Sequence, residues 1–136
     1  MPQQDLAKEF MSAGVWAYPT WYSETSCISA MEAQAAGLHM VTSPIAALNE
    51  TASDRATMIH GDWLSDSYSE AFVNATVEAM KNTSEEKRAS LMNYACQNFN
   101  WDSVAKEWDS MMKKMVSQAE YGTLEFQYQG SSEAAE

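Results

Sequence analysis

Residues 14–20 read GVWAYPT, and the longer stretch 14–43, GVWAYPTWYSETSCISAMEAQAAGLHMVTS, contains the pattern that decides the fold. The first seven residues are mostly apolar, are rich in residues that favour strands, and stop at Pro19. Such a run predicts a short buried strand. Thr20 to Ser23 predict the loop that follows it.

The segment from Thr25 to Ala36 is rich in Ala, Met, Glu and Gln, which favour helix. Gly37 stands where a helix needs a left-handed C-terminal cap, and Thr25 or Ser26 can cap its start. The apolar run MVTS before Pro44 then predicts a second buried strand. We therefore expect a helix over 25–36 between two strands.

The flanking segments extend this order. We expect a helix over Gln4–Ser12, one helical turn at Ala46–Glu50, a third strand at Thr57–Ile59, a helix over Tyr68–Met80, and two more helices capped by Ser84 and Asp102. Alternating helices and strands predict an α/β fold with a short parallel sheet that ends in two or three helices, and three short strands suit part of a larger α/β domain. The predicted domain covers residues 1–120, and the polar tail 121–136 is expected to be disordered.

Apolar spacing predicts the buried faces of the later helices. One face is expected to comprise Phe72, Val73, Thr76, Val77 and Met80, the next Leu91, Met92, Ala95, Cys96 and Phe99, and the last Val104, Ala105, Trp108, Met111, Met112 and Met115. We expect no internal repeat.

The composition excludes several classes of protein. The net charge is −11, with 8 basic and 19 acidic residues, and such a chain repels nucleic acid and anionic membranes. No apolar run reaches the length of a transmembrane helix, and we expect no signal peptide. Two cysteines, Cys27 and Cys96, make neither a disulfide framework nor a metal cluster. The predicted location is the cytoplasm.

Residues 18–37 contain the candidate site. Ligands of open α/β sheets bind beyond the carboxyl ends of the strands, and the free N–H groups at a helix start, here Thr25 to Ile28, bind anions without a lysine. This suits residues 1–80, whose only basic side chains are Lys8 and Arg55. Glu24 stands at this helix start and Glu32 lies eight residues later, where a carboxylate can bind a ribose diol. Both glutamates also have a structural explanation. Glu24 can interact with the helix dipole, and Glu32 can stand in the helix because glutamate favours helix.

The same segment resembles the signature of family-4, GT-B fold, retaining glycosyltransferases. That signature is a strand ending in Pro-Ser or Pro-Thr, a loop, Glu, seven residues, Glu-Ala, and then Ala-Gly; here it stands as PT, WYS, ETSCISAME and AQAAG. HMVTSPIAALNET, TMIHGDW and NFNWDSVAKEWDSMM resemble the segments that follow in the family, so the match spans about residues 6–115.

The resemblance implies a partial Rossmann-like fold, the second half of a GT-B C-terminal domain, and a role for each matched residue. Glu32 matches the acid that binds the nucleotide ribose, and Glu24 the catalytic-site acid that orients the donor sugar. The amides of Thr25, Ser26, Cys27 and Ile28 match the helix start that holds the diphosphate. The donor would be a nucleotide-diphosphate sugar, and neither a metal nor another cofactor is implied.

The sequence departs from the family at Cys27, where glycine is common, and at Ala56, which replaces a frequent glycine. The family's diphosphate-binding Arg and Lys and its acceptor-binding domain have no counterpart here. The predicted function is thus the donor-binding portion of a glycosyltransferase (EC 2.4), inactive by itself. The alternative is a non-catalytic interaction module, or a subunit of a split protein, that pairs with a copy of itself or with a partner chain through an exposed sheet edge.

Overall fold

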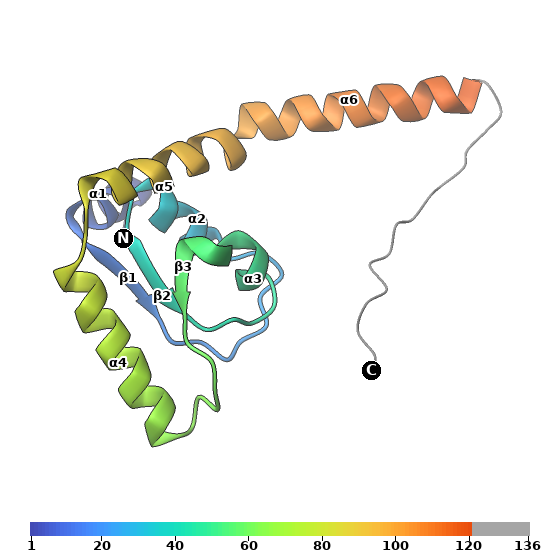
Figure 1. Cartoon of the computed structure of the whole chain (residues 1–136). Coiled ribbons are helices and arrows are strands. Elements are labelled where there is room, and N and C mark those ends of the chain that lie inside the picture. The colour runs from blue at the N-terminus through green and yellow to red at the C-terminus, as the bar shows by residue number, and fades with distance from the viewer. Residues whose placement is uncertain (121–136) are drawn as a thin grey trace. The chain divides into compact units, whose positions relative to one another are not determined.

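The computed structural model of the 136-residue chain describes residues 1–120 (Figure 1). Residues Met1–Asn100 form one compact unit, and helix α6 (Trp101–Glu120) belongs to a second. The tail predicted over 121–136 lies outside the described residues.

The first unit is built on a three-stranded parallel sheet. Strands β1 (Val15–Tyr18), β2 (His39–Thr42) and β3 (Ala56–Met58) lie in the order β1-β2-β3. Val15 pairs with His39, and Met40 pairs with Ala56. The predicted α/β class and parallel sheet are confirmed, and β1 is an edge strand, with no strand on its outer side within residues 1–120.

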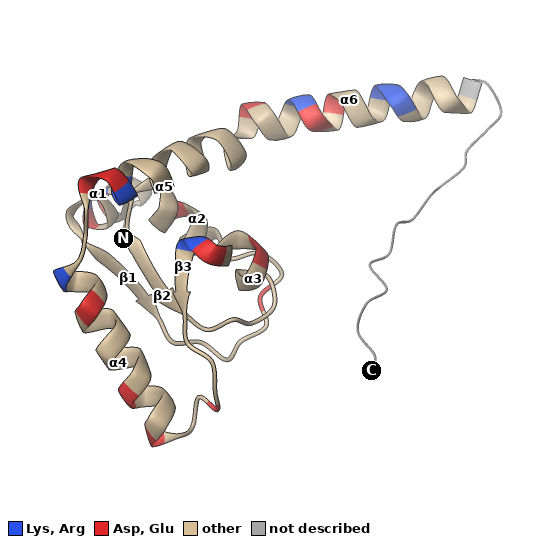
Figure 2. Cartoon of the chain, in the orientation of Figure 1, with Lys and Arg blue, Asp and Glu red and all other residues tan. Residues whose placement is uncertain are grey.

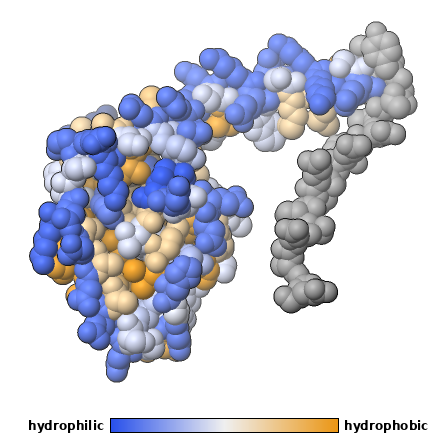
Figure 3. All heavy atoms as spheres, in the orientation of Figure 1, coloured by the Kyte–Doolittle hydropathy of each residue, from blue (hydrophilic) through white to orange (hydrophobic). Residues whose placement is uncertain are grey.

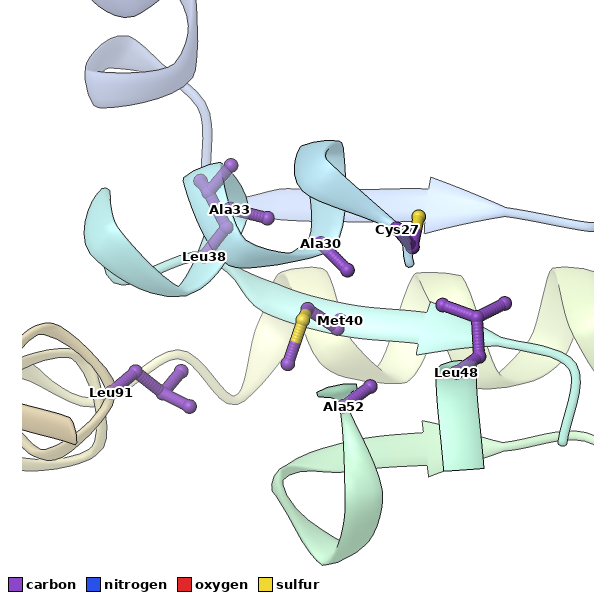
Figure 4. Packing of buried hydrophobic residues seen from close by; sticks show 8 residues of the cluster. All are labelled: Cys27, Ala30, Ala33, Leu38, Met40, Leu48, Ala52 and Leu91. Atoms are coloured by element: carbon purple, nitrogen blue, oxygen red, sulfur yellow. The ribbon is translucent and has the colours of Figure 1, made fainter. Parts of the chain in front are cut away.

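Helices cover both faces of the sheet. Alternate residues of β2 point to opposite faces, so Met40 and Val41 enter two different clusters. On the Met40 side, helices α2 (Ile28–Ala35) and α3 (Leu48–Thr51) pack on the sheet, and α5 (Glu85–Asn98) packs on α2. Figure 4 shows this cluster, which comprises Cys27, Ala30, Ala33, Leu38, Met40, Leu48, Ala52 and Leu91.

Helix α4 (Asp66–Lys81) covers the Val41 side. Ser65 caps it by accepting a hydrogen bond from the Tyr68 N–H. The predicted face of this helix is wrong in part, because the buried side chains are Tyr68, Phe72 and Ala79, whereas Val73, Val77 and Met80 are exposed. The Tyr68 hydroxyl bonds the Ser43 Oγ at 2.6 Å, which turns this edge of the helix toward the sheet.

Helix α5 meets α2 at Gly37. This glycine has a φ of +71°, and a Cβ there would lie 3.0 Å from the Arg88 carbonyl oxygen. The helix is capped by Ser84 as predicted, and it buries Leu91 and Ala95. Met92 and Cys96, also predicted to be inside, are exposed, because α2 covers only one narrow stripe of α5.

Helix α1 (Gln3–Ser12) packs against α2 and has no fully buried residue. Its side chain Phe10 packs on the cluster around Met40. A 3-10 turn, η1 (Ser53–Arg55), leads into β3.

Helix α6 begins at Trp101, so Asp102 lies in its first turn. The prediction that Asp102 caps this helix is therefore wrong. The predicted burial of its apolar stripe is also wrong, because Trp108, Met111, Met112 and Met115 are exposed. Within residues 1–120 no helix is both long and apolar enough to cross a membrane.

Candidate functional site

The three segments that leave the carboxyl ends of the strands form the candidate site. They are residues 19–27 after β1, 43–47 after β2 and 59–62 after β3 (Figure 1). In parallel α/β sheets this edge binds ligands, because loops and helix starts converge there. No lysine or arginine occurs in these segments (Figure 2).

Glu24 is held by both neighbouring segments. The Tyr18 hydroxyl donates a hydrogen bond of 2.6 Å to Glu24 Oε1, and the Ala47 N–H donates one of 3.2 Å to the Glu24 carbonyl. Glu24 is half-buried. This hydrogen bond to a carboxylate raises the pKa of Tyr18 above its ordinary value. The structure therefore fixes Glu24 at the end of the first strand.

Helix α2 begins three residues later than predicted. Its N-cap is Cys27 rather than Thr25 or Ser26, and no side chain bonds the first turn. The cause is the Glu24 carbonyl, which would accept from the Ile28 N–H in a longer helix but accepts from Ala47 instead.

The backbone N–H groups before α2 nonetheless remain unbonded. Within residues 1–120, the N–H groups of Thr25, Ser26, Cys27 and Ile28 have no protein acceptor. Cys27 is fully buried, whereas Thr25, Ser26 and Ile28 are exposed. The unbonded N–H groups of these three exposed residues, beside a helix start, form an anion-binding arrangement. The Cys27 side chain points into the core, where burial raises the pKa of its thiol.

Glu32 lies on α2, in a hollow of about 270 Å³ between α1 and α2. This side chain is half-buried and is the only acidic group of that hollow. The other lining residues are Gln3, Leu6, Ala7, Phe10, Met11, Ala35 and Ala36. The structure does not bring Glu32 into contact with Glu24, whose neighbours are Tyr18 and Cys27.

A second hollow, of about 360 Å³, lies at the carboxyl ends of β2 and β3. Trp21 and Trp63 stack in it with ring centroids 4.4 Å apart, and both are partly exposed. Its lining residues are Thr20, Trp21, Ser43, Pro44, Ile45, Ile59, His60, Gly61, Trp63 and Tyr68. The sequence indicates Trp21 and Tyr22 as residues that can stack on a base or sugar, but it gives no sign of Trp63, which is 42 residues further along the chain.

Arg55 does not belong to the candidate site. Its Nε donates to the buried Gln34 Oε1 at 2.8 Å and its Nη2 to the Thr51 carbonyl at 3.0 Å. Its guanidinium also lies 3.7 Å from the centroid of the Tyr94 ring. Arg55 is therefore a structural residue that joins α2, α3 and α5.

Comparison of the chain with protein-family models, with curated proteins and with solved structures gives no match. Within residues 1–120, no group of three or more His, Cys, Asp and Glu side chains is placed to hold a metal ion.

Proposed function

We propose that this chain is the donor-binding portion of a retaining glycosyltransferase of the GT-B type. It would bind a nucleotide-diphosphate sugar, whose glycosyl group passes to an acceptor hydroxyl in the complete enzyme. The observation that carries the proposal is the position of Glu24, fixed at the carboxyl end of β1 and followed directly by the unbonded amides of residues 25–28.

These amides suit a diphosphate. A row of N–H groups at a helix start supplies hydrogen bonds and the positive end of the helix dipole, and it needs no basic side chain. Cys27 occupies the position where the related enzymes have glycine. Because Cys27 is fully buried in the core (Figure 4), its side chain does not cover the amides of the exposed residues Thr25, Ser26 and Ile28.

Glu32 suits a ribose. An ionised carboxylate accepts two hydrogen bonds from a vicinal diol, and the apolar wall of its hollow offers a surface for the base. Glu24, at the other end of the donor, would orient the sugar through hydrogen bonds to its hydroxyl groups. In this role Tyr18 positions Glu24 rather than contacting the donor itself.

Nucleotide titration by two-dimensional amide NMR tests the proposal. Uridine, guanosine and adenosine diphosphates are the probes, and we expect shifts at residues 24–32 for at least one of them. Glu32→Ala should weaken that binding by about 1.5–3 kcal/mol, the value of a hydrogen bond to a charged group. Glu70→Ala, an exposed glutamate on α4, is the matched control and should bind as the unmodified chain does. Shifts confined to other residues, or equal affinity of Glu32→Ala, would contradict the proposal.

The second candidate function is a non-catalytic interaction module. It is favoured by one observation, the unpaired outer side of β1. A chain that binds no nucleoside diphosphate yet associates through β1 would belong to this class.

A further inference from the structure

Contrary to the expectation of no internal repeat, helix α6 contains a short seven-residue repeat. Its sequence divides into WDSVAKE (101–107), WDSMMKK (108–114) and MVSQAE (115–120), so serine stands at the third position of each repeat. We name the repeat positions a to g, with Trp101, Trp108 and Met115 at a. Val104 and Met111 then occupy d, and a and d residues share one side of the helix.

Within its own unit, as far as residues 101–120 describe it, this side of α6 packs against no other element. Trp108 is 57 % exposed and Met111 is 46 % exposed. Figure 3 shows hydrophobic residues on one side of α6. In proteins, the packing of an amphipathic helix through its apolar side supplies most of its stability. The stripe therefore requires a covering surface.

The charges of α6 decide what covers it. Asp109 and Lys113, at positions b and f, form an ion pair of 2.7 Å on the outer side of the helix. Glu107 and Lys114, both at position g beside the apolar stripe, form no side-chain ion pair or hydrogen bond within residues 1–120. Residues at g flank the partner in a two-helix coiled coil and set its orientation.

We propose that α6 pairs antiparallel with α6 of a second copy of this chain. In an antiparallel pair, a positions face d positions and g positions face g positions. Trp108 then packs against Met111 of the second copy, and Glu107 faces Lys114 of the second copy. The twofold symmetry repeats both contacts, which gives two ion pairs and matches each large ring with a narrower side chain.

A parallel pair lacks this complementarity. It would stack Trp108 on its own counterpart, and g positions would face e positions, where the residues are Ala105, Met112 and Ala119. Neither Glu107 nor Lys114 would then meet an opposite charge. The side chains of the helix thus favour the antiparallel arrangement.

Sedimentation equilibrium of the full chain over a range of concentrations, at about 0.1 M salt, tests this pairing. We expect a reversible dimer. Glu107→Lys and Lys114→Glu should each raise its dissociation constant roughly tenfold, because each replaces two attractive contacts with two repulsive ones. The chain that carries both substitutions should return to the affinity of the unmodified chain.

Two control variants distinguish pairing through α6 from a general effect of net charge and from association through another surface. Lys106→Glu changes the net charge as Lys114→Glu does, but at position f on the outer side, and should leave the dimer unchanged. Met111→Lys places a charge in both central layers and should give a monomer whose first unit keeps its melting temperature. A chain that stays monomeric at all concentrations would overturn the proposal, as would a dimer that Met111→Lys leaves intact. Failure of the double substitution to restore the dimer would overturn the antiparallel arrangement.

Discussion

The Tyr18 hydroxyl donates a 2.6 Å hydrogen bond to the carboxylate of Glu24 across the end of β1. Tyr18 belongs to the strand, whereas Glu24 belongs to the irregular segment before α2. This bond and the bond between the Ala47 N–H and the Glu24 carbonyl fix a loop residue to β1 and to the residue that precedes α3. The position of the Glu24 carboxylate is thus fixed relative to the sheet, although Glu24 lies in a loop.

The first prediction concerns the titration of Tyr18. Its hydrogen bond to Glu24 raises the pKa of Tyr18 above 10.0, so Glu24→Gln should return that pKa toward the ordinary value. Because the folded pKa is raised, the bond stabilises the fold below about pH 10 and its contribution is lost as the pH rises through the folded pKa. Titration of carbon-labelled tyrosine by NMR measures the shift, with Tyr18→Phe to assign the signal. An unchanged Tyr18 titration in Glu24→Gln would contradict this role.

Catalysis is the subject of the second prediction. We expect the 136-residue chain alone to transfer no sugar from any nucleotide donor to an acceptor. In the first 80 residues the only basic side chains are Lys8 and Arg55. Lys8 forms an ion pair with Asp5 on α1, and Arg55 is bound to Gln34 and Thr51, so neither stabilises a departing diphosphate.

A donor-hydrolysis and transfer assay measures this, with Glu24→Ala as the control for contaminating activity. Turnover above background that Glu24→Ala abolishes would show that residues of this chain suffice for the reaction.

The sequence predicts the order of strands and helices in the first unit because its apolar runs and caps are local signals. Ser84 illustrates this, since it caps α5 as its position indicates. The start of α2 was not predictable in the same way. It depends on whether the Glu24 carbonyl accepts from Ile28 or from Ala47, and Ala47 lies 23 residues away in the sequence.

Which side of a helix is buried likewise depends on residues that are distant in the sequence. Spacing alone groups Phe72 with Val77 on α4, but the Tyr68 hydroxyl binds Ser43, 25 residues earlier, and buries a different side. For the candidate site, the position of Glu24 beside the helix start follows from the sequence. The stacking of Trp63 on Trp21 does not, because it depends on how two loops approach each other.

The third prediction is a pH dependence of stability due to His39. Its Nε2 shares a 3.0 Å hydrogen bond with Thr57 Oγ1, and its Nδ1 lies 3.0 Å from Lys87 Nζ. Burial, and then the charge of Lys87, lower the pKa of His39 below 6.5. The unfolded chain therefore binds a proton more readily, and stability should fall as the pH drops below about 6.5 toward the folded pKa.

Urea unfolding at about pH 7.5 and about pH 5.5 measures the fall. His39→Gln should reduce it because the titrating group is gone, and Lys87→Met should reduce it in part. If His39→Gln loses as much stability as the unmodified chain between these pH values, the fall has another origin.

The last prediction concerns the edge of the sheet. In the register of β1 and β2 the Gly14 carbonyl accepts from His39, which directs the N–H and C=O groups of Val15 and Ala17 away from β2. Ala17 is exposed, and helix α1 packs on α2. Open backbone groups on an edge strand favour pairing with another strand, and two copies of β1 would pair antiparallel about a twofold axis.

Charge opposes this pairing, because the chain has a net charge of −11. The Debye length falls from about 10 Å at 0.1 M salt to about 3 Å at 1 M, so we expect association through β1 to increase with salt. The chain to use is Met111→Lys, in which α6 cannot pair, and sedimentation at the two salt concentrations is the measurement. Ala17→Pro removes one outward N–H group and should suppress the association, whereas Ala17→Thr keeps that group and should not. A monomer at both salt concentrations would mean that α1 or another segment of the chain covers the edge.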